Sequence, residues 1–417
     1  MRIDRLGDLG DAPAVLRALS AATARLVLPP PAALIGDWFS SRAVLAPSLD
    51  ARSVAVTEVF DVAPGDRADG PVGGGWFGYL AYPDAGADGG GGAPRVPPAA
   101  GGWSDYVLRC DSDGIWWHES LSGAALPDWV ADALTSSPPA TDATVSWGDA
   151  DRAAHQHGVA ACLQAIAAGD VYQACVCTRF TGTLDGDPAD FFTEAVSRTA
   201  PSRAAYVAGD WGAVASLSPE LFLCRRGDSV TSSPIKGTLP RTADPATLRT
   251  SVKDVAENIM IVDLVRNDLG RVARTGTVTV PELLAVRAAP GVWHLVSTVA
   301  ADVPVDLPMG ALLDATFPPA SVTGTPKTRA RQLLSAWEPH SRGVYCGTVG
   351  FASPVAGCEL NVAIRTVEFA ADGTAVLGVG GGITADSDPV AEWEECLHKA
   401  APILGVTSQP RARSTAS

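Results

Sequence analysis

The sequence predicts an α+β fold in which mainly antiparallel β-sheets are enclosed by helices. Short apolar runs that indicate strands follow one another across tight Gly- and Asp-containing turns, and longer amphipathic stretches that indicate helices separate one group of strands from the next. The chain has 417 residues, of which 47% are hydrophobic and 18% charged. This composition is typical of a globular protein, and the length is sufficient for one large core or two ordinary ones.

The first 135 residues are expected to form a β-rich N-terminal region. Its apolar runs, interrupted by Gly and Pro, indicate strands at 43–45, 54–56, 76–80 and 106–108. The segment 84–102, rich in Gly, Ala, Pro and Asp, is predicted to be a flexible surface loop. A Ser/Pro-rich break at 136–142 separates this region from the main body, residues 145–405, and residues 406–417 are predicted to be a disordered tail.

The main body begins with a predicted helix at 151–168, followed by a strand at 171–180. Two successive hairpins then lead from residue 206 to residue 236, and they are expected to place Glu220 and Lys236 on paired neighbouring strands.

The second half of the main body alternates helices and strands. A long helix is predicted at 247–268, with Val255, Ile259, Val262 and Val265 facing inward. Pro326 is expected at the first position of a helix that runs to Trp337. The remaining elements are strands at 344–351, 361–369 and 375–379 and a final helix at 389–404.

The overall charge and the cysteine content exclude several classes of function. The net charge is −15 and no run of five basic residues occurs, which argues against nucleic-acid binding. No apolar run reaches the length of a membrane span, and the chain opens without an apolar signal segment. Eight cysteines without a CxxC pair predict reduced thiols and a cytoplasmic location.

Lys236 is the strongest candidate for a nucleophile. Only four of the 31 Lys and Arg residues are lysines, so this sequence uses arginine where any cation would serve. An amine can lose its proton and attack carbon, whereas a guanidinium stays charged at any working pH. Lys236 lies in a turn of Pro, Gly and Thr residues at 233–241, and the alternative is a surface lysine without a chemical role.

Acidic residues are spaced three apart on two predicted helices. Asp254 and Glu257 share one helix face, and Glu392 and Glu395 share another. If two such faces meet, they form the oxygen-only site that Mg²⁺ prefers. The alternative is a solvated surface, on which Glu395 pairs with Lys399 one turn further on.

Further features suggest contacts with an anion. Residues 380–382, three glycines after a strand, and residues 323–327, at a helix start, can each point backbone N–H groups at a negative group, or each can be only a turn. Arg365, expected inside an apolar strand, needs an anionic partner, which is either a ligand carboxylate or an internal Asp or Glu. His294 is either a substrate contact or a packed core histidine.

Motifs in a fixed order along the main body resemble those of the chorismate-utilising enzymes. They are PIKGT at 234–238, AEN at 256–258 with DLVRND at 263–268, TGTPK at 323–327, AIRT at 363–366 and GGG at 380–382. The resemblance covers about 170–404, with a weaker likeness at 75–79, and identifies 145–405 as a chorismate-binding catalytic domain. It implies two packed, mainly antiparallel sheets flanked by helices, with chorismate and Mg²⁺ bound between them.

The resemblance also implies roles for particular residues. Glu257 and Glu395 would ligate Mg²⁺, with Glu392 close by through water, and the metal would hold the ring carboxylate. The positions that resemble the family's carboxylate-binding residues are Tyr345, Arg365, Gly380, Gly381 and Lys399, and those that line the ring are Thr238, His294 and Thr323.

Glu220 matches the general acid of the family. To protonate the departing C4 hydroxyl it must stay protonated near neutral pH, which requires a pKa above the usual value. Lys236 would add to C2, and ammonia would then enter at C4 and displace the lysine. Anthranilate synthases typically carry alanine at the position of Lys236, and the water-using branch carries a lysine base where this chain has Gln173, so both residues favour amination at C4.

No glutaminase segment is recognisable, so ammonia is expected from solution or from a separate glutamine amidotransferase subunit. One alternative is amination at C2 with loss of pyruvate, the anthranilate synthase reaction. Another is a non-catalytic chorismate-binding regulatory subunit. The presence of both Glu220 and Lys236 argues against this last alternative, because a binding protein needs neither an acid nor a nucleophile.

Overall fold

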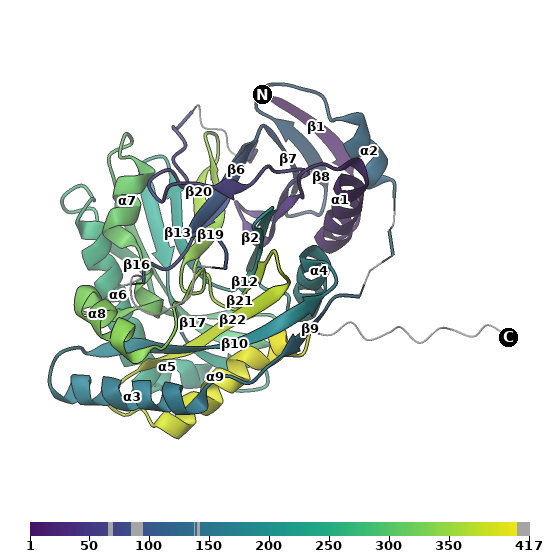
Figure 1. The fold of residues 1–417 in the computed structure, drawn as a ribbon. Coiled ribbons are helices and arrows are strands. Elements are labelled where there is room, and N and C mark those ends of the chain that lie inside the picture. Colours follow the sequence, from purple (N-terminus) through teal and green to yellow (C-terminus); the bar gives the residue numbers. More distant parts are fainter. Residues whose placement is uncertain (66–69, 85–94, 137, 140–141, 407–417) are drawn as a thin grey trace.

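Two antiparallel sheets pack face to face between layers of helices (Figure 1). The computed structural model describes residues 1–65, 70–84, 95–136, 138–139 and 142–406, and the architecture is that of this part of the chain. The hydrophobic core is layered in the same way, with clusters between helices and sheets and a cluster between the two sheets. The predicted α+β class, with two packed sheets flanked by helices, is confirmed.

The first sheet combines strands from both halves of the chain. In spatial order its strands are β1 (Arg2–Gly7), β8 (Trp116–Ser120), β7 (Tyr106–Cys110), β3 (Ser41–Ala46), β2 (Ala32–Trp38), β11 (Arg203–Gly209), β12 (Gly212–Ser218), β21 (Thr366–Ala370), β22 (Thr374–Ile383), β10 (Gln173–Asp185) and β18 (Gly324–Thr325), with β9 (Thr144–Trp147) also paired to β10.

The second sheet also combines strands from both halves. Its strands are β15 (Ile235–Pro240), β17 (Val292–Asp302), β14 (Ser229–Ser233), β13 (Leu221–Arg226), β20 (Gly357–Asn361), β19 (Thr348–Ser353), β5 (Gly75–Leu80), β6 (Ala99–Ser104) and β4 (Arg52–Ser53), with β16 (Thr279–Ala289) also paired to β17. The predicted ranges 1–135 and 145–405 therefore do not form separate sheets.

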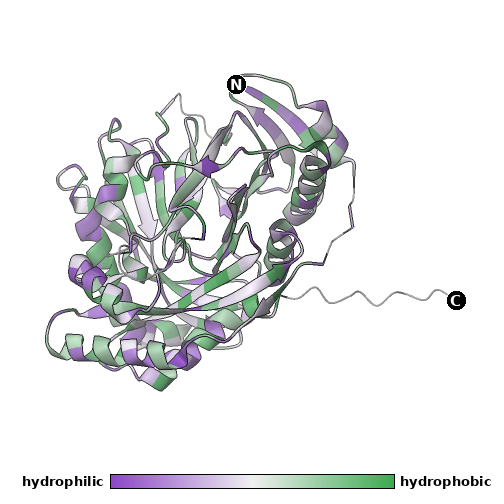
Figure 2. Cartoon of the chain, viewed as in Figure 1, coloured by the Kyte–Doolittle hydropathy of each residue, from purple (hydrophilic) through white to green (hydrophobic). Residues whose placement is uncertain are grey.

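Helices cover the outer faces of this double sheet. The helices are α1 (Ala12–Leu26), α2 (Asp128–Leu134), α3 (Arg152–Ala167), α4 (Pro188–Thr199), α5 (Ala246–Thr250), α6 (Val252–Gly270), α7 (Met309–Thr316), α8 (Lys327–Trp337) and α9 (Pro389–Leu404). Buried residues of α1, α4 and α9 pack on the first sheet, whereas those of α6 and α7 pack on the second. Figure 2 shows apolar residues along the central strands and polar residues on the outer turns of the helices.

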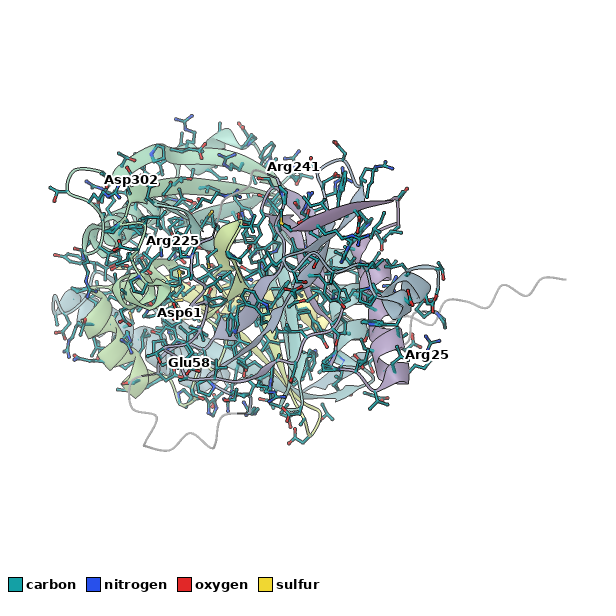
Figure 3. The ribbon with its side chains drawn as sticks, turned by 90° about the horizontal axis from the view of Figure 1, so that it is seen from above. Arg25, Glu58, Asp61, Arg225, Arg241 and Asp302 are labelled. Atoms are coloured by element: carbon teal, nitrogen blue, oxygen red, sulfur yellow. The ribbon has the colours of Figure 1, made fainter. Side chains whose placement is uncertain are left out.

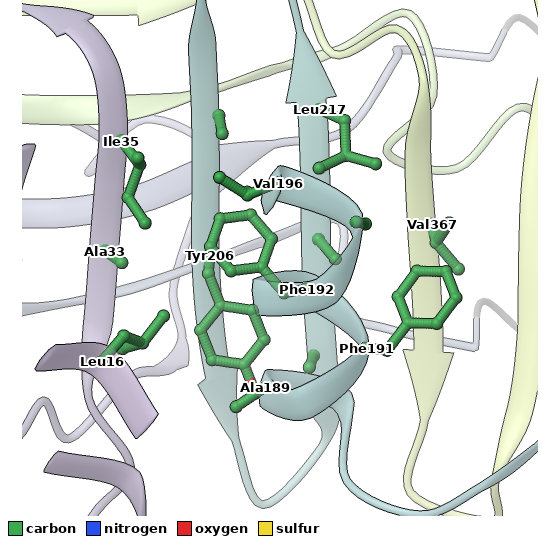
Figure 4. Packing of buried hydrophobic residues seen from close by; sticks show 14 of the residues in the cluster. Leu16, Ala33, Ile35, Ala189, Phe191, Phe192, Val196, Tyr206, Leu217 and Val367 are labelled. Carbon is green, nitrogen blue, oxygen red and sulfur yellow. The ribbon is translucent and has the colours of Figure 1, made fainter. Parts of the chain in front are cut away.

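Aromatic side chains anchor α4 to the first sheet (Figure 4). The ring of Phe192 lies 5.3 Å from that of Tyr206, and the ring of Phe191 lies 5.2 Å from that of Phe369. Full burial of a side chain of this size contributes roughly 1.5–3 kcal/mol. A second apolar layer, which includes Leu34 and Phe351, fills the space between the two sheets.

Charged side chains lie mostly on the surface of the molecule, and Arg25, Glu58 and Asp302, which are labelled in Figure 3, are all exposed. Arg225 is an exception, because it is buried and donates hydrogen bonds to the carbonyl oxygens of Gly227, Pro304, Val305 and Leu307. These four backbone acceptors satisfy its guanidinium, so Arg225 has a structural function in holding the loop before α7.

Several predicted elements need correction. Helix α1 was not predicted, residues 54–56 are not a strand, and β6 occupies the end of the segment predicted to be a loop. Residues 85–94 of that segment lie outside the described residues, as do 137 and 140–141 at the predicted boundary and 407–417 of the predicted tail. Pro326 precedes α8 instead of occupying its first position.

The predicted long helix is two helices. Ser251 ends α5 and caps α6, because its side chain accepts a hydrogen bond from the N–H of Asp254. Val262 and Val265 face inward as predicted, but Ile259 is 41% exposed. The buried face of α6 also carries the polar residues Glu257 and Asn258. The prediction, which used only the apolar residues, therefore placed the inward face of this helix incorrectly.

Glu220 and Lys236 are not on paired strands. Glu220 lies where the chain leaves β12 in the first sheet and enters β13 in the second. Leu221 pairs with Ser233 of β14, whereas Lys236 lies on β15, which pairs with β17. The predicted pairing is wrong in this detail because β14 ends before Pro234 and a new strand begins after it.

Candidate active site

Lys236 points into the protein beside a buried carboxylate. Its side chain is 13% exposed, and its Nζ lies 4.0 Å from Oε2 of Glu257 on α6. Both groups lie against the bare backbone of Gly382 in β22, where an added Cβ would be 3.2 Å from the amine and 3.7 Å from the carboxylate oxygen. Glycine at this position therefore leaves room for the amine and the carboxylate.

Glu220 is a buried acid with an unusual pKa. Its residue is 4% exposed, and this burial raises the pKa of the carboxyl to about 7, although the Ser321 hydroxyl and the charge of Lys236 act in the opposite direction. A small pocket reaches Glu220 and is also lined by Ser321 and Asp268. At neutral pH a substantial fraction of Glu220 is protonated, as a general acid requires.

The acidic faces of α6 and α9 meet, with a lysine between them. Glu257 on α6 and Glu392 on α9 are both buried. Lys253 Nζ lies 4.0 Å from Oε1 of Glu257 and 3.5 Å from Oε1 of Glu392, which also accepts a hydrogen bond of 2.6 Å from Ser387. Burial raises the pKa of Glu257, and the charges of Lys236 and Lys253 oppose this shift.

Glu395 lies at the edge of this cluster. Its side chain is 47% exposed and forms a 2.7 Å ion pair with Lys399 one turn on, the arrangement that the sequence left open as an alternative. Lys399 also donates a hydrogen bond of 3.0 Å to the carbonyl oxygen of Gly380. A Cβ on Gly381 would lie 3.1 Å from Oε2 of Glu392 and 3.7 Å from Nζ of Lys399, so these groups share one small space.

The residues present fit a divalent cation. Oε1 of Glu257 is buried and has no hydrogen-bond partner among the described residues, so it has a lone pair available for a cation. Within the same described ranges, no group of three or more His, Cys, Asp or Glu side chains is already gathered as a metal site. Mg²⁺ binds proteins through one or two carboxylates and keeps several waters, so Glu257 with one neighbouring glutamate suffices.

Thr238 and His294 face each other across β15 and β17. The Thr238 hydroxyl and Nδ1 of His294 are 2.9 Å apart. Burial and the nearby positive charge of Arg365 lower the pKa of His294 to about 4, so its ring is neutral at physiological pH. A neutral imidazole next to a hydroxyl can donate or accept a hydrogen bond but does not offer a charge.

Arg365 is not in a strand. It lies in the break between β20 and β21 with a φ of 52°, a left-handed backbone conformation that few arginines adopt. Its guanidinium has no hydrogen bond or ion pair with the described residues, and burial lowers its pKa. The internal Asp or Glu partner considered from the sequence is therefore absent from the described chain, and the guanidinium is available to a ligand carboxylate.

The other predicted anion-binding features differ from expectation. Gly380–Gly382 lie inside β22, paired with 175–177 of β10, and do not follow the strand. Lys327 at the start of α8 is bound internally, because its Nζ donates to Asp268 at 2.6 Å and to two backbone carbonyls. Thr323 is fully buried, and its hydroxyl donates to the carbonyl of Pro319.

Tyr345 packs against the backbone of β22. Its residue is 6% exposed, and burial raises the pKa of its phenol well above the ordinary value. A Cβ at Gly378 would overlap the tyrosine ring, at 2.2 Å from Cγ, so the ring requires glycine there. Tyr345 therefore forms part of the wall beside the three glycines.

Sequence reasoning missed Lys253 as a member of the site. The available signals were the scarcity of lysine and the four-residue spacing from Lys253 to Glu257, which places both on one helix face.

Gln173 contributes a second buried polar atom without a hydrogen-bond partner among the described residues, after Oε1 of Glu257. Its Oε1 is buried without a hydrogen-bond partner in the described chain and would lie 3.9 Å from a Cβ on Gly382.

The double sheet and the lysine–glutamate site between its helices define a class of chorismate-binding proteins. The family model described as "chorismate binding enzyme" matches residues 55–405, so the chain belongs to this family. The chain is 44% identical over 243 residues to "Aminodeoxychorismate synthase component 1" of Klebsiella aerogenes, which covers 57% of this chain and 54% of the relative.

The chain is also similar to an anthranilate synthase component and to a solved structure of another such component. "Anthranilate synthase component 1" of Streptomyces coelicolor is 37% identical over 330 residues, 76% of this chain and 63% of that protein. The crystal structure of anthranilate synthase component I from Streptococcus pneumoniae superposes with a TM-score of 0.72 at 22% identity, covering 97% of this chain and 92% of that one, which shows the shared fold. The chain spans about half the length of the aminodeoxychorismate synthase relatives that it matches.

Proposed function

We propose that this chain acts as an aminodeoxychorismate synthase component I. It aminates chorismate at C4 with ammonia and yields 4-amino-4-deoxychorismate and water, without releasing pyruvate. The observation that carries the proposal is a mostly buried amine, Lys236, whose charge acts on a buried acid, Glu220, with a pKa of about 7. The 44% identity to a protein of that name supports the choice within the family.

In this mechanism Glu220 donates its proton to the C4 hydroxyl, which leaves as water. The amine of Lys236 forms a bond to C2 as the C4–O bond breaks, and the two conjugated ring double bonds each shift by one position. Ammonia then forms a bond to C4, both double bonds return to their original positions, and the C2–N bond to Lys236 breaks. The proton lost by the entering ammonia balances the one that Glu220 supplied.

The remaining residues bind and orient the substrate. Arg365, with no partner among the described residues, binds one carboxylate, and Lys399 lies near Gly380 and Gly381, where the other can be held. Thr238 and neutral His294 contact the ring, with Thr323 and Tyr345 behind it. Glu257 and Glu395 would hold Mg²⁺, with Glu392 close to them, and a bound ion would supply positive charge for the ring carboxylate.

Ammonia comes from a glutamine amidotransferase partner. This part of the proposal rests on the name "component 1" of the relatives, which indicates a second component. The described helices include none that is long and apolar enough to cross a membrane. We place the reaction in the cytoplasm, where the eight cysteines, all free in the structure, remain reduced.

The specific alternative is anthranilate formation, favoured by the 37% identity to an anthranilate synthase component over 76% of the chain. The decisive experiment is to incubate purified protein with chorismate, Mg²⁺ and ammonium and to identify the product by chromatography and mass spectrometry. We expect 4-amino-4-deoxychorismate; anthranilate with pyruvate would replace the proposal by the alternative. Absence of turnover at saturating ammonium would instead indicate a chorismate-binding subunit.

A further inference from the structure

Lys253 is the cation between the two acidic helices. Its Nζ lies 4.0 Å from Oε1 of Glu257 on its own helix and 3.5 Å from Oε1 of Glu392 on α9. The two carboxylates are buried, whereas the Lys253 side chain is 46% exposed. The lysine therefore reaches inward from the surface, and a path outward is open to it.

Lys253 approaches Oε1 of Glu257, which is an oxygen atom that a divalent cation needs. Oε1 of Glu257 has no hydrogen bond within the described chain, because the ammonium group stays 4.0 Å away. Mg²⁺ requires contact with such an oxygen at about 2.0–2.1 Å. An ammonium group and a divalent ion cannot both occupy the space between the same two carboxylates, because like charges at that separation repel strongly.

Two other ammonium groups surround this space. Lys236 is 4.0 Å from the other oxygen of Glu257, and Lys399 is paired with Glu395 at 2.7 Å. Lys236 is mostly buried, and Lys399 is fixed by its ion pair and by the carbonyl of Gly380. Lys253 has only long contacts, 3.5 Å to Glu392 and 4.0 Å to Glu257, and is the lysine that can leave at the lowest cost.

We propose that Lys253 is a resident counter-ion, which occupies the space between Glu257 and Glu392 in the metal-free protein and is displaced toward solvent when a divalent cation binds. This inference rests on the metal site of the proposed function. Lys253 is thus a positioning residue: its ammonium group holds the two buried carboxylates in place until the metal arrives. The free energy of metal binding that is measured is therefore the free energy gained when the ion binds the carboxylates less the free energy lost when Lys253 leaves them.

The test is a titration with Mg²⁺ in the absence of chorismate, measured by isothermal calorimetry. Lys253→Met removes the competing charge with little change in side-chain volume, and we expect Mg²⁺ to bind about tenfold more tightly than to the parent, a change of 1.4 kcal/mol. Lys253→Arg keeps the charge and is the matched control, with affinity close to that of the parent. In EDTA, Lys253→Met should unfold at a lower temperature than the parent, and Mg²⁺ should remove this difference.

Unchanged or weaker Mg²⁺ binding by Lys253→Met would overturn the inference. If Lys253→Met does not unfold cooperatively, Lys253→Gln, which retains a polar group, is measured instead with the same expectation. Failure of the parent to bind Mg²⁺ at all would overturn the inference together with the metal part of the proposed function. The product assay decides amination at C4 separately, because it reports the site of nitrogen addition and not metal affinity.

Discussion

The amine of Lys236 lies 4.0 Å from the carboxylate of Glu257, and both groups lie over the Cα position of Gly382. This relationship brings β22 together with β15 and α6, which lie much earlier in the sequence. Because the amine is held between a carboxylate and a bare backbone, small changes at Gly382 should alter its position without affecting the core.

We expect Gly382→Ala to lower kcat about tenfold while leaving the thermal unfolding temperature nearly unchanged. The added Cβ would be 3.2 Å from the flexible end of Lys236, so the amine moves and the fold does not. Gly270→Ala is the matched control, because its Cβ would meet nothing within 4 Å. Equal rates for the two variants would show that the amine need not lie beside Gly382.

Lys236→Ala should reduce the rate of C4 amination about a thousandfold, equal to roughly 4 kcal/mol of transition-state stabilisation. Lys236→Arg should be equally inactive, because a guanidinium stays charged and cannot add to carbon. Chorismate binding, followed by calorimetry, should persist in both variants. An active arginine variant would mean that Lys236 acts through its charge and not as a nucleophile.

The activity should fall as the pH rises through about 7, because the protonated form of Glu220 is the acid. Glu220→Gln should lose the reaction and with it this limb of the pH profile. Glu368→Gln is a matched control: Glu368 is also buried with a pKa of about 7, and it accepts a hydrogen bond from the N–H of Val344. A Glu368→Gln profile without the alkaline fall would assign the titration to Glu368 instead.

The raised pKa of Glu220 also predicts that the free energy of unfolding depends on pH. Glu220 has a pKa of about 7 in the folded chain against an ordinary value of 4.5, so between these values the folded state binds more protons than the unfolded state. Stability is therefore lost as the pH rises from 4.5 to 7, by on the order of 3 kcal/mol. Urea unfolding of the parent and Glu220→Gln at pH 5 and pH 8 measures this loss, and parallel curves would contradict it.

Lys327→Met should destabilise the fold by roughly 3–5 kcal/mol, because it leaves the Asp268 carboxylate buried without its 2.6 Å partner. The double variant Lys327→Met with Asp268→Asn should recover part of this loss, since no unpaired charge remains. Urea unfolding gives both values. Additive effects of the two substitutions would mean that the pair is not coupled.

The sequence identified the chemistry of the site better than its geometry. Lys236 and Glu220 were found from residue type and motif, yet their expected pairing on neighbouring strands is wrong, because Pro234 interrupts the strand between them. The predicted final helix agrees with α9 at both ends, since a capping Asp388 and an apolar face are local signals. Helix α1 was missed although it has a capping Asp11 and an apolar face.

By itself, the sequence determined which residue types could act: one amine in a proline–glycine turn, one glutamate before a strand, and acidic residues at helical spacing. Only the tertiary structure decided that Lys253 lies between Glu257 and Glu392, that Arg365 has no acidic partner in the described chain, and that Glu220 has a pKa near 7. The physical reason is the separation along the sequence over which each kind of interaction acts. Helical periodicity and caps act between residues a few positions apart, whereas desolvation and ion pairing depend on groups that the chain brings together from distant positions.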